Sequence, residues 1–227
     1  AGYESPKFPT FNGFWSKETY APNNVNFQRE DVDGRLYNAA TLRRYVLVPQ
    51  QTGTLVIDPA ELVCLVNVRS SSSSARSIFD SFFDTGTTTI RKRIATSSVR
   101  VNVKNLPGGA PASFCGGVGN FTINAKLNQS SLKAHEANSL IITVSGRGNV
   151  SLLEAPKVNF PPDMEVYDTK SSESTTPNSG GTSGSKTFEY PFIPRSHGDF
   201  IIEPIEYSYY NVTTGKYETL TTAPIPF

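Results

Sequence analysis

Two stretches of this chain repeat each other, and the repeat decides the fold. Residues 44–62 read RYVLVPQQTGTLVIDPAEL, and residues 189–207 read EYPFIPRSHGDFIIEPIEY. A shift of 190 − 45 = 145 positions aligns the two stretches without a gap. The identical pairs are Tyr45 with Tyr190, Pro49 with Pro194, Gly53 with Gly198, Ile57 with Ile202, Pro59 with Pro204, and Glu61 with Glu206. The repeat predicts two copies of one structural unit, with prolines and glycines marking equivalent turns.

A second, shorter match lies upstream of each copy. Residues 4–7 read ESPK and residues 154–157 read EAPK, at a shift of 156 − 6 = 150 positions. Residues 108–153 precede the second motif and hold strand-like runs around Phe121 and Leu140, which have no counterpart ahead of the first motif. We therefore expect the sequence to be part of a longer protein and its first copy to lack the opening strands. Either another chain replaces those strands, or the first copy is less complete than the second.

The hydrophobic pattern is that of strands rather than helices. Short apolar runs of Val, Ile, Thr, Phe and Tyr recur between turn residues, and runs such as Leu140-Ile142-Val144 alternate with period two. Asp33-Gly34, Thr214-Gly215 and residues 146–149 (GRGN) are typical of chain reversals. The sequence predicts an all-β protein of tandem immunoglobulin-like β-sandwich domains, the first incomplete at its N-terminus.

The repeat also predicts the domain boundaries. Residues 1–107 would form the C-terminal part of a first domain, and residues 108–227 a second domain. Residues 169–186 (TKSSESTTPNSGGTSGSK) are almost free of apolar side chains, so we expect a flexible loop there.

An insert, residues 70–93, interrupts the first domain. Within it Phe79, Phe82 and Phe83 would lie with Ile78 on one side of a short helix. These phenylalanines are candidates for contact with a partner or a membrane surface; the alternative is that they cap an open end of the sandwich.

Composition excludes several classes of function. The 21 basic and 20 acidic residues nearly balance, which argues against a nucleic-acid partner. Neither a membrane-spanning apolar run nor a signal-peptide pattern occurs. The two cysteines, Cys64 and Cys115, have no zinc-ligand spacing and form either one disulfide or two buried thiols. We expect no metal and no cofactor.

Two groups of residues suggest catalysis, and neither is well supported. Residues 82–87 (FFDTGT) match the surroundings of an aspartic-protease carboxylate, which would make Asp84 the catalytic group of a dimeric enzyme. No second Asp-Thr-Gly occurs, and a turn closing the insert explains the motif better. Ser196, His197 and Asp199 are too close along the chain to form a triad, so His197 is interpreted as a solvent-facing turn residue.

Several ordered motifs resemble the BatD family of bacterial aerotolerance, or oxygen tolerance, proteins. They are residues 114–121 (FCGGVGNF), residues 146–149, residues 154–157, and Tyr190 with Pro194, Gly198 and Pro204. The Phe-rich insert followed by residues 99–107 (VRVNVKNLP) and 111–114 (PASF) is similar to that family's junction between domains. The family has no known catalytic residues to carry over.

The resemblance implies a non-enzymatic, extracytoplasmic scaffold of the bacterial envelope, on the periplasmic side. It also implies anchoring by a membrane helix outside these residues, and protein partners from the Bat operon, including von Willebrand A-domain proteins. The alternative reading of the strands is a cell-surface adhesin or carbohydrate-binding β-sandwich.

Overall fold

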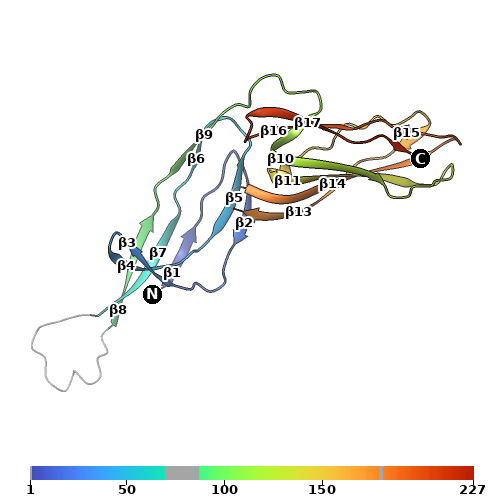
Figure 1. Cartoon of the computed structure of the whole chain (residues 1–227). Helices are drawn as coiled ribbons and strands as arrows, with labels where there is room; N and C mark the ends of the chain where they lie inside the picture. Colours follow the sequence, from blue (N-terminus) through green and yellow to red (C-terminus); the bar gives the residue numbers. More distant parts are fainter. Residues whose placement is uncertain (1, 70–86, 179–180) are drawn as a thin grey trace, which may run out of the picture. The chain divides into compact units, whose positions relative to one another are not determined.

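The computed structural model describes residues 2–69, 87–178 and 181–227, and in these ranges the chain is built from β-strands (Figure 1). The predicted all-β class is confirmed: the sheets curl as they do in β-sandwich and immunoglobulin-like domains. The tandem arrangement stays a prediction.

The described residues before position 106 form nine strands. They are β1 (Gly2–Lys7), β2 (Phe14–Tyr20), β3 (Gln28–Val32), β4 (Arg35–Ala39), β5 (Arg44–Pro49), β6 (Gly53–Ile57), β7 (Glu61–Arg69), β8 (Thr87–Ala95) and β9 (Val99–Val103). They form one three-stranded sheet in the order β1-β7-β8 and three two-stranded sheets, β2-β5, β3-β4 and β6-β9. We call residues 2–103 the first repeat.

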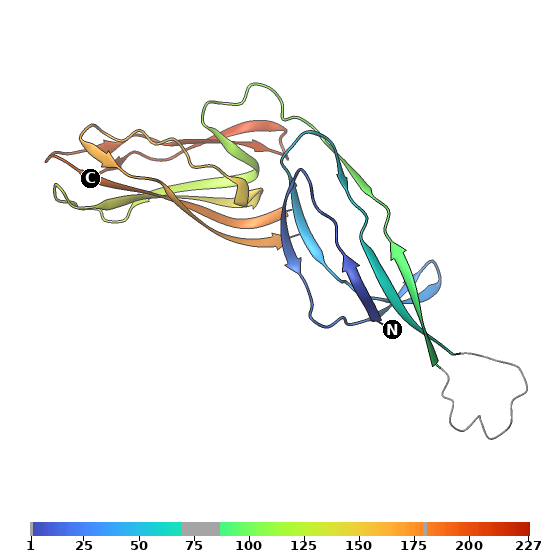
Figure 2. The same ribbon diagram turned by 180° about the vertical axis from the view of Figure 1, so that it is seen from behind.

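The remaining strands form the second repeat, residues 114–226. They are β10 (Phe114–Leu127), β11 (Asn138–Gly148), β12 (Met164–Val166), β13 (Lys170–Asn178), β14 (Gly181–Pro194), β15 (Ile201–Ile202), β16 (Glu206–Asn211), β17 (Lys216–Thr221) and β18 (Ile225–Pro226), with a 3-10 turn, η2, at Val150–Leu152. One sheet has the order β12-β14-β11-β10-β16-β17, β13 pairs with β14, and β15 pairs with β18. Figure 2 shows the same strands from behind.

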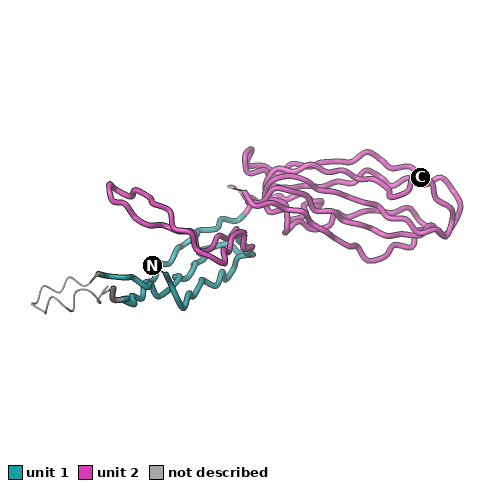
Figure 3. Tube along the Cα trace, turned by 90° about the horizontal axis from the view of Figure 1, so that it is seen from below, with its two compact units in different colours: residues 1–16, 49–105 teal, residues 17–48, 106–227 magenta. Residues whose placement is uncertain are grey.

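The chain divides into two compact units that do not coincide with the repeats. One unit comprises residues 1–16 and 49–105, and the other comprises residues 17–48 and 106–227 (Figure 3). The division into domains 1–107 and 108–227 stays a prediction.

The hydrophobic core lies in the second repeat. Its strands alternate buried and less buried positions, so that Leu140, Ile142 and Val144 of β11 are all 0% exposed. Phe188 and Phe192 of β14 add to this core. The fully buried residues of the described chain all lie between positions 115 and 211.

The prediction of a flexible loop at residues 169–186 is wrong. Residues 170–178 form β13 and residues 181–186 open β14, and the two strands pair antiparallel from Lys170↔Glu189 to Asn178↔Gly181. Backbone hydrogen bonds hold this hairpin, and they require no apolar side chains. A further antiparallel strand, β11, pairs with the other edge of β14.

Two other sequence expectations need correction. Of the predicted insert 70–93, residues 87–93 belong to β8, which pairs with β7. The GRGN segment is not a chain reversal either, because Gly146 and Gly148 end strand β11, opposite Phe121 and Gly119 of β10. Asp33-Gly34 and Thr214-Gly215 do lie at reversals, with Gly34 and Gly215 at positive φ.

Glycines in β10 and β11 allow close approach of backbone. A Cβ added at Gly146 would overlap the carbonyl oxygen of Asn120 and lie 2.8 Å from Cδ1 of Phe121. Since these atoms belong to the paired strand, room for a methyl group requires the strands to separate. Next to this point the Asn149 side chain accepts a hydrogen bond from Val118 N (2.7 Å) and donates one to Gly116 O (2.8 Å).

We expect Gly146→Ala to lower the free energy of unfolding by about 3 kcal/mol, since overpacking against backbone is poorly relieved. Gly108→Ala is the control, because nothing lies within 4 Å of a Cβ at that position. Urea denaturation of both variants measures the difference. Equal stabilities would contradict this account of Gly146.

Two buried tyrosines differ in their hydroxyl partners. Tyr190 donates a hydrogen bond to Pro156 O (2.5 Å), whereas the hydroxyl of Tyr207 has no hydrogen-bond partner among the described residues. A buried hydroxyl without a hydrogen-bond partner lowers the stability of the folded state, so removing that hydroxyl should not destabilise the protein.

We therefore expect Tyr190→Phe to destabilise the protein by about 1–2 kcal/mol. Tyr207→Phe, which deletes the same atom from an equally buried ring, should be neutral or stabilising. Denaturant melts of the two variants test the contrast, and a larger loss for Tyr207→Phe would contradict it.

Candidate functional site

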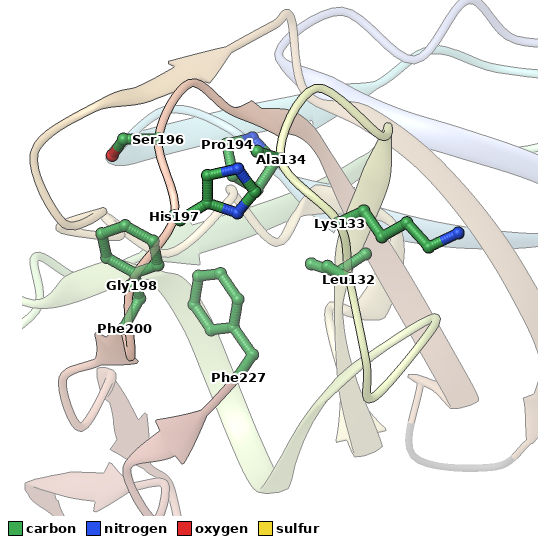
Figure 4. Close-up of a pocket in the computed structure, with 9 residues that line it drawn as sticks. All are labelled: Leu132, Lys133, Ala134, Pro194, Ser196, His197, Gly198, Phe200 and Phe227. Carbon is green, nitrogen blue, oxygen red and sulfur yellow. The ribbon is translucent and has the colours of Figure 1, made fainter.

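A cavity of about 90 Å³ lies at one end of the second repeat, beside the turn after β14. It is lined by Leu132, Lys133, Ala134, Pro194, Ser196, His197, Gly198, Phe200 and Phe227 (Figure 4). This cavity is the candidate binding site of the described chain.

Three segments bring these residues together. The loop between β10 and β11 is tied to the end of β14, because His135 N donates to Pro194 O (2.8 Å). Phe200 and Phe227 exchange two backbone hydrogen bonds of 3.0 Å each. The walls of the cavity are therefore fixed by backbone hydrogen bonds.

The floor of the cavity is aromatic. The rings of Phe200 and Phe227 lie 5.7 Å apart, and Phe227 packs edge-on against the buried Phe192 at 5.5 Å. Figure 4 shows the imidazole of His197 near these rings and the Lys133 side chain extending away from them. An apolar or aromatic side chain would fit this floor, with the imidazole as its polar neighbour.

The structure confirms part of the sequence interpretation of His197. The residue is exposed in a turn, as predicted, but it also lines the cavity, which sequence reasoning missed. The Ser196 hydroxyl donates a hydrogen bond to the carboxylate of Asp163 (3.2 Å), which is distant in sequence. This bond does not involve His197 or Asp199, the neighbours considered for a catalytic triad. The sequence did contain one signal for this cavity. Phe200 lies only three positions after His197 in the repeated turn, and an aromatic residue so close to a histidine could have indicated a binding site.

The other predicted site residues lie outside the described residues. This holds for Phe79, Phe82 and Phe83 of the insert, and for Asp84 of the protease-like motif. Their predicted roles stay untested.

Burial suppresses the reactivity of several titratable groups. Cys64 and Cys115 are free thiols. Burial, with a smaller contribution from Glu154, raises the pKa of Cys115, which keeps the thiol protonated. Burial likewise raises the pKa of Tyr190 and of Tyr207 far above the ordinary tyrosine range. Cys115, Tyr190 and Tyr207 therefore behave as core side chains.

The pKa of one carboxyl group, that of Glu218, is lowered rather than raised. Glu218 accepts hydrogen bonds from Tyr209 (2.8 Å), Asn211 (2.8 Å) and Thr214 (3.0 Å). These bonds, the one from Tyr209 first, hold the pKa of Glu218 below its ordinary value. The cluster closes the β16–β17 turn, so its evident role is structural.

No group of three or more His, Cys, Asp or Glu that could hold a metal ion occurs within residues 2–69, 87–178 and 181–227. In the same ranges, no helix has the length and apolarity needed to cross a membrane.

The curled sheets and their buried alternating faces define an all-β protein of the β-sandwich type. Residues 125–227 match the family described as the BatD DUF11-like domain. The C-terminal part of the chain is therefore similar to BatD proteins, which confirms the resemblance that the sequence motifs predicted. BatD domains are not a known enzyme family. No curated protein and no solved structure matches the chain.

Because Glu218 has a lowered pKa in the folded state, its ionised form adds stability at neutral pH. That contribution is lost as the pH falls from about 4.3, the ordinary glutamate value, through the lower folded pKa. We expect Glu218→Gln to be less stable than the wild type at pH 7, with a difference that shrinks below pH 4. Thermal melts between pH 3 and 7 measure this, and a pH-independent difference would contradict it.

Proposed function

We propose that this chain is a non-enzymatic interaction region of a BatD-like protein on the periplasmic, extracytoplasmic face of a bacterial envelope. The observation that carries the proposal is the match of residues 125–227 to the BatD domain. Every residue that lines the cavity falls within that range. The strands thus serve as a rigid support for a binding surface.

The partners we propose are the proteins that accompany BatD in its operon, foremost the von Willebrand A-domain proteins, in a membrane complex tied to oxygen tolerance. Anchoring would come from a membrane helix outside residues 1–227. The cavity would take one apolar side chain of the partner against the rings of Phe200 and Phe227, because an aromatic pocket offers a large contact area at low entropic cost.

We expect His197→Ala and Phe200→Ala to weaken binding of the purified von Willebrand A-domain partner roughly 30-fold, the size of a hot-spot truncation. His197 is exposed, so its removal leaves the fold intact. Phe27→Ala is the matched control, since Phe27 is a 46% exposed aromatic residue outside the BatD match. Isothermal titration calorimetry measures the affinities.

Two outcomes would contradict the proposal at different levels. If the wild-type chain shows no binding to any Bat-operon protein, the proposed function is wrong. If binding occurs but the cavity variants bind like Phe27→Ala, the function stands and the cavity is not the contact.

A further inference from the structure

Strand β13 lies at an edge of the large sheet of the second repeat. In the part of the chain that the structure describes, it pairs with β14 along one side and with no strand along the other. Figures 1 and 2 show it at the border of this sheet. Seven of its nine residues are exposed, and the other two, Thr175 and Pro177, are half-buried. Such an edge presents unpaired backbone groups that can hydrogen-bond to a further strand.

Pro177 shows which backbone groups of β13 face the open edge. Successive residues of an antiparallel strand direct their N–H and C=O groups alternately toward one side and the other. Proline has no N–H, and in an edge strand its nitrogen faces the open side. Pro177 lies opposite Thr182 of β14, in a pairing without register shifts. In steps of two from Pro177, the residues Ser171, Glu173 and Thr175 therefore direct their backbone groups to the open edge.

The charges on the open strand edges differ. Strand β8, at one edge of the β1-β7-β8 sheet, holds Arg91, Lys92 and Arg93 in its middle. A second β8 paired there would bring like charges opposite each other, which is a usual protection of an edge against association. Strand β13 reads KSSESTTPN, and its charged residues are Lys170 and Glu173. Most of its length therefore lacks that protection.

The sequence of β13 suits antiparallel pairing with a second copy of itself. About a two-fold axis at Ser174, Glu173 lies opposite Thr175 of the second copy, and Ser171 lies opposite Pro177 of the second copy. Residues that face the open edge thus meet one another, as the hydrogen-bond pattern requires. An axis at Glu173 would bring two carboxylates together, and an axis at Thr175 would leave Ser171 beyond the end of the second strand. The register about Ser174 is therefore favoured.

The same register brings together two opposite charges. Lys17 of β2 belongs to the same compact unit as β13, and its Nζ donates to Oγ1 of Thr175 (2.8 Å). Opposite residues of an antiparallel pair have Cβ atoms about 5 Å apart, so Glu173 of the second copy comes within reach of this ammonium group. Among the described residues, no ion pair joins Lys17 to a carboxylate or Glu173 to a cation. Glu173 accepts from the Ser151 hydroxyl (3.1 Å), and Lys186 opposite it donates to Ser151 O (2.9 Å).

We propose that the open edge of β13 is a self-association site, where a second copy of this chain adds its own β13 antiparallel about Ser174. Main-chain hydrogen bonds between Glu173 and Thr175 form on both sides of the axis, and ion pairs from Lys17 to Glu173 fix the register. Strand addition to an edge is a common recognition mode, and a closed two-fold contact is the commonest form of homo-oligomer. The contact is small, so the dimer depends on protein concentration.

Disulfide trapping tests the register. At the axis the two Ser174 residues form a pair without mutual hydrogen bonds, where Cα atoms lie about 4.5 Å apart, which is within disulfide range. We expect Ser174→Cys to form a disulfide-linked dimer roughly tenfold faster, or more, than Ser172→Cys, whose two sulfur atoms lie on opposite sides of the axis. Non-reducing gel electrophoresis follows the reaction. The unsubstituted chain gives the background from Cys64 and Cys115.

Charge substitutions test the same edge without a covalent link. Ser174→Lys brings two ammonium groups together at the axis, so we expect it to abolish the rise in sedimentation mass with protein concentration. Asn124→Lys is the matched control, because Asn124 is an exposed residue of β10 away from this edge. Lys17→Glu and Glu173→Lys should each weaken association roughly tenfold, and the double variant should restore it.

Several results would overturn the proposal. They are a monomer mass at every concentration, equal trapping of Ser172→Cys and Ser174→Cys, and equal effects of Ser174→Lys and Asn124→Lys. Amide exchange identifies the occupant: if the amides of Glu173 and Thr175 are protected only after a Bat-operon protein is added, that protein supplies the strand and the second copy is wrong. The trapping and sedimentation experiments use the chain alone, so their failure is separable from failure of the proposed function.

Discussion

The parallel pairing of β10 with β16 is the contact on which the second repeat depends. β10 joins β11 along one edge and β16 along the other, so it connects the hairpin strands β13 and β14 to the β16-β17 pair. Its side chain Phe121 packs with Tyr209, and its glycines let the backbone of β11 approach. Without this strand the sheet would divide into two pieces, each with an unpaired edge.

The first repeat has smaller sheets. Its described strands form one three-stranded sheet and three two-stranded sheets. Two-stranded pairs are marginal by themselves, because they bury little apolar surface. This agrees with the buried residues of the described chain, which all lie within the second repeat.

The buried core of the second repeat is separate from its cavity. The core of β11 and β14 holds the titratable groups Cys115, Tyr190 and Tyr207 protonated, which suits packing rather than chemistry. The cavity beside Phe200 and Phe227 is built from turns that the strands hold in place. Binding loops on a rigid sheet are the usual arrangement in proteins that act by association.

The sequence by itself determined the strand class, the repeat and the BatD motifs, because alternation, turn residues and identical spacings are local properties of the chain. Reversals at Asp33-Gly34 and Thr214-Gly215 were predictable for the same reason. That residues 170–186 form an ordered hairpin was not predictable, since β14 of this hairpin also pairs with a strand distant in sequence, β11. The cavity at His197 and the pairing of β1 with β7 were likewise decided only by tertiary structure, because both depend on segments far apart in sequence.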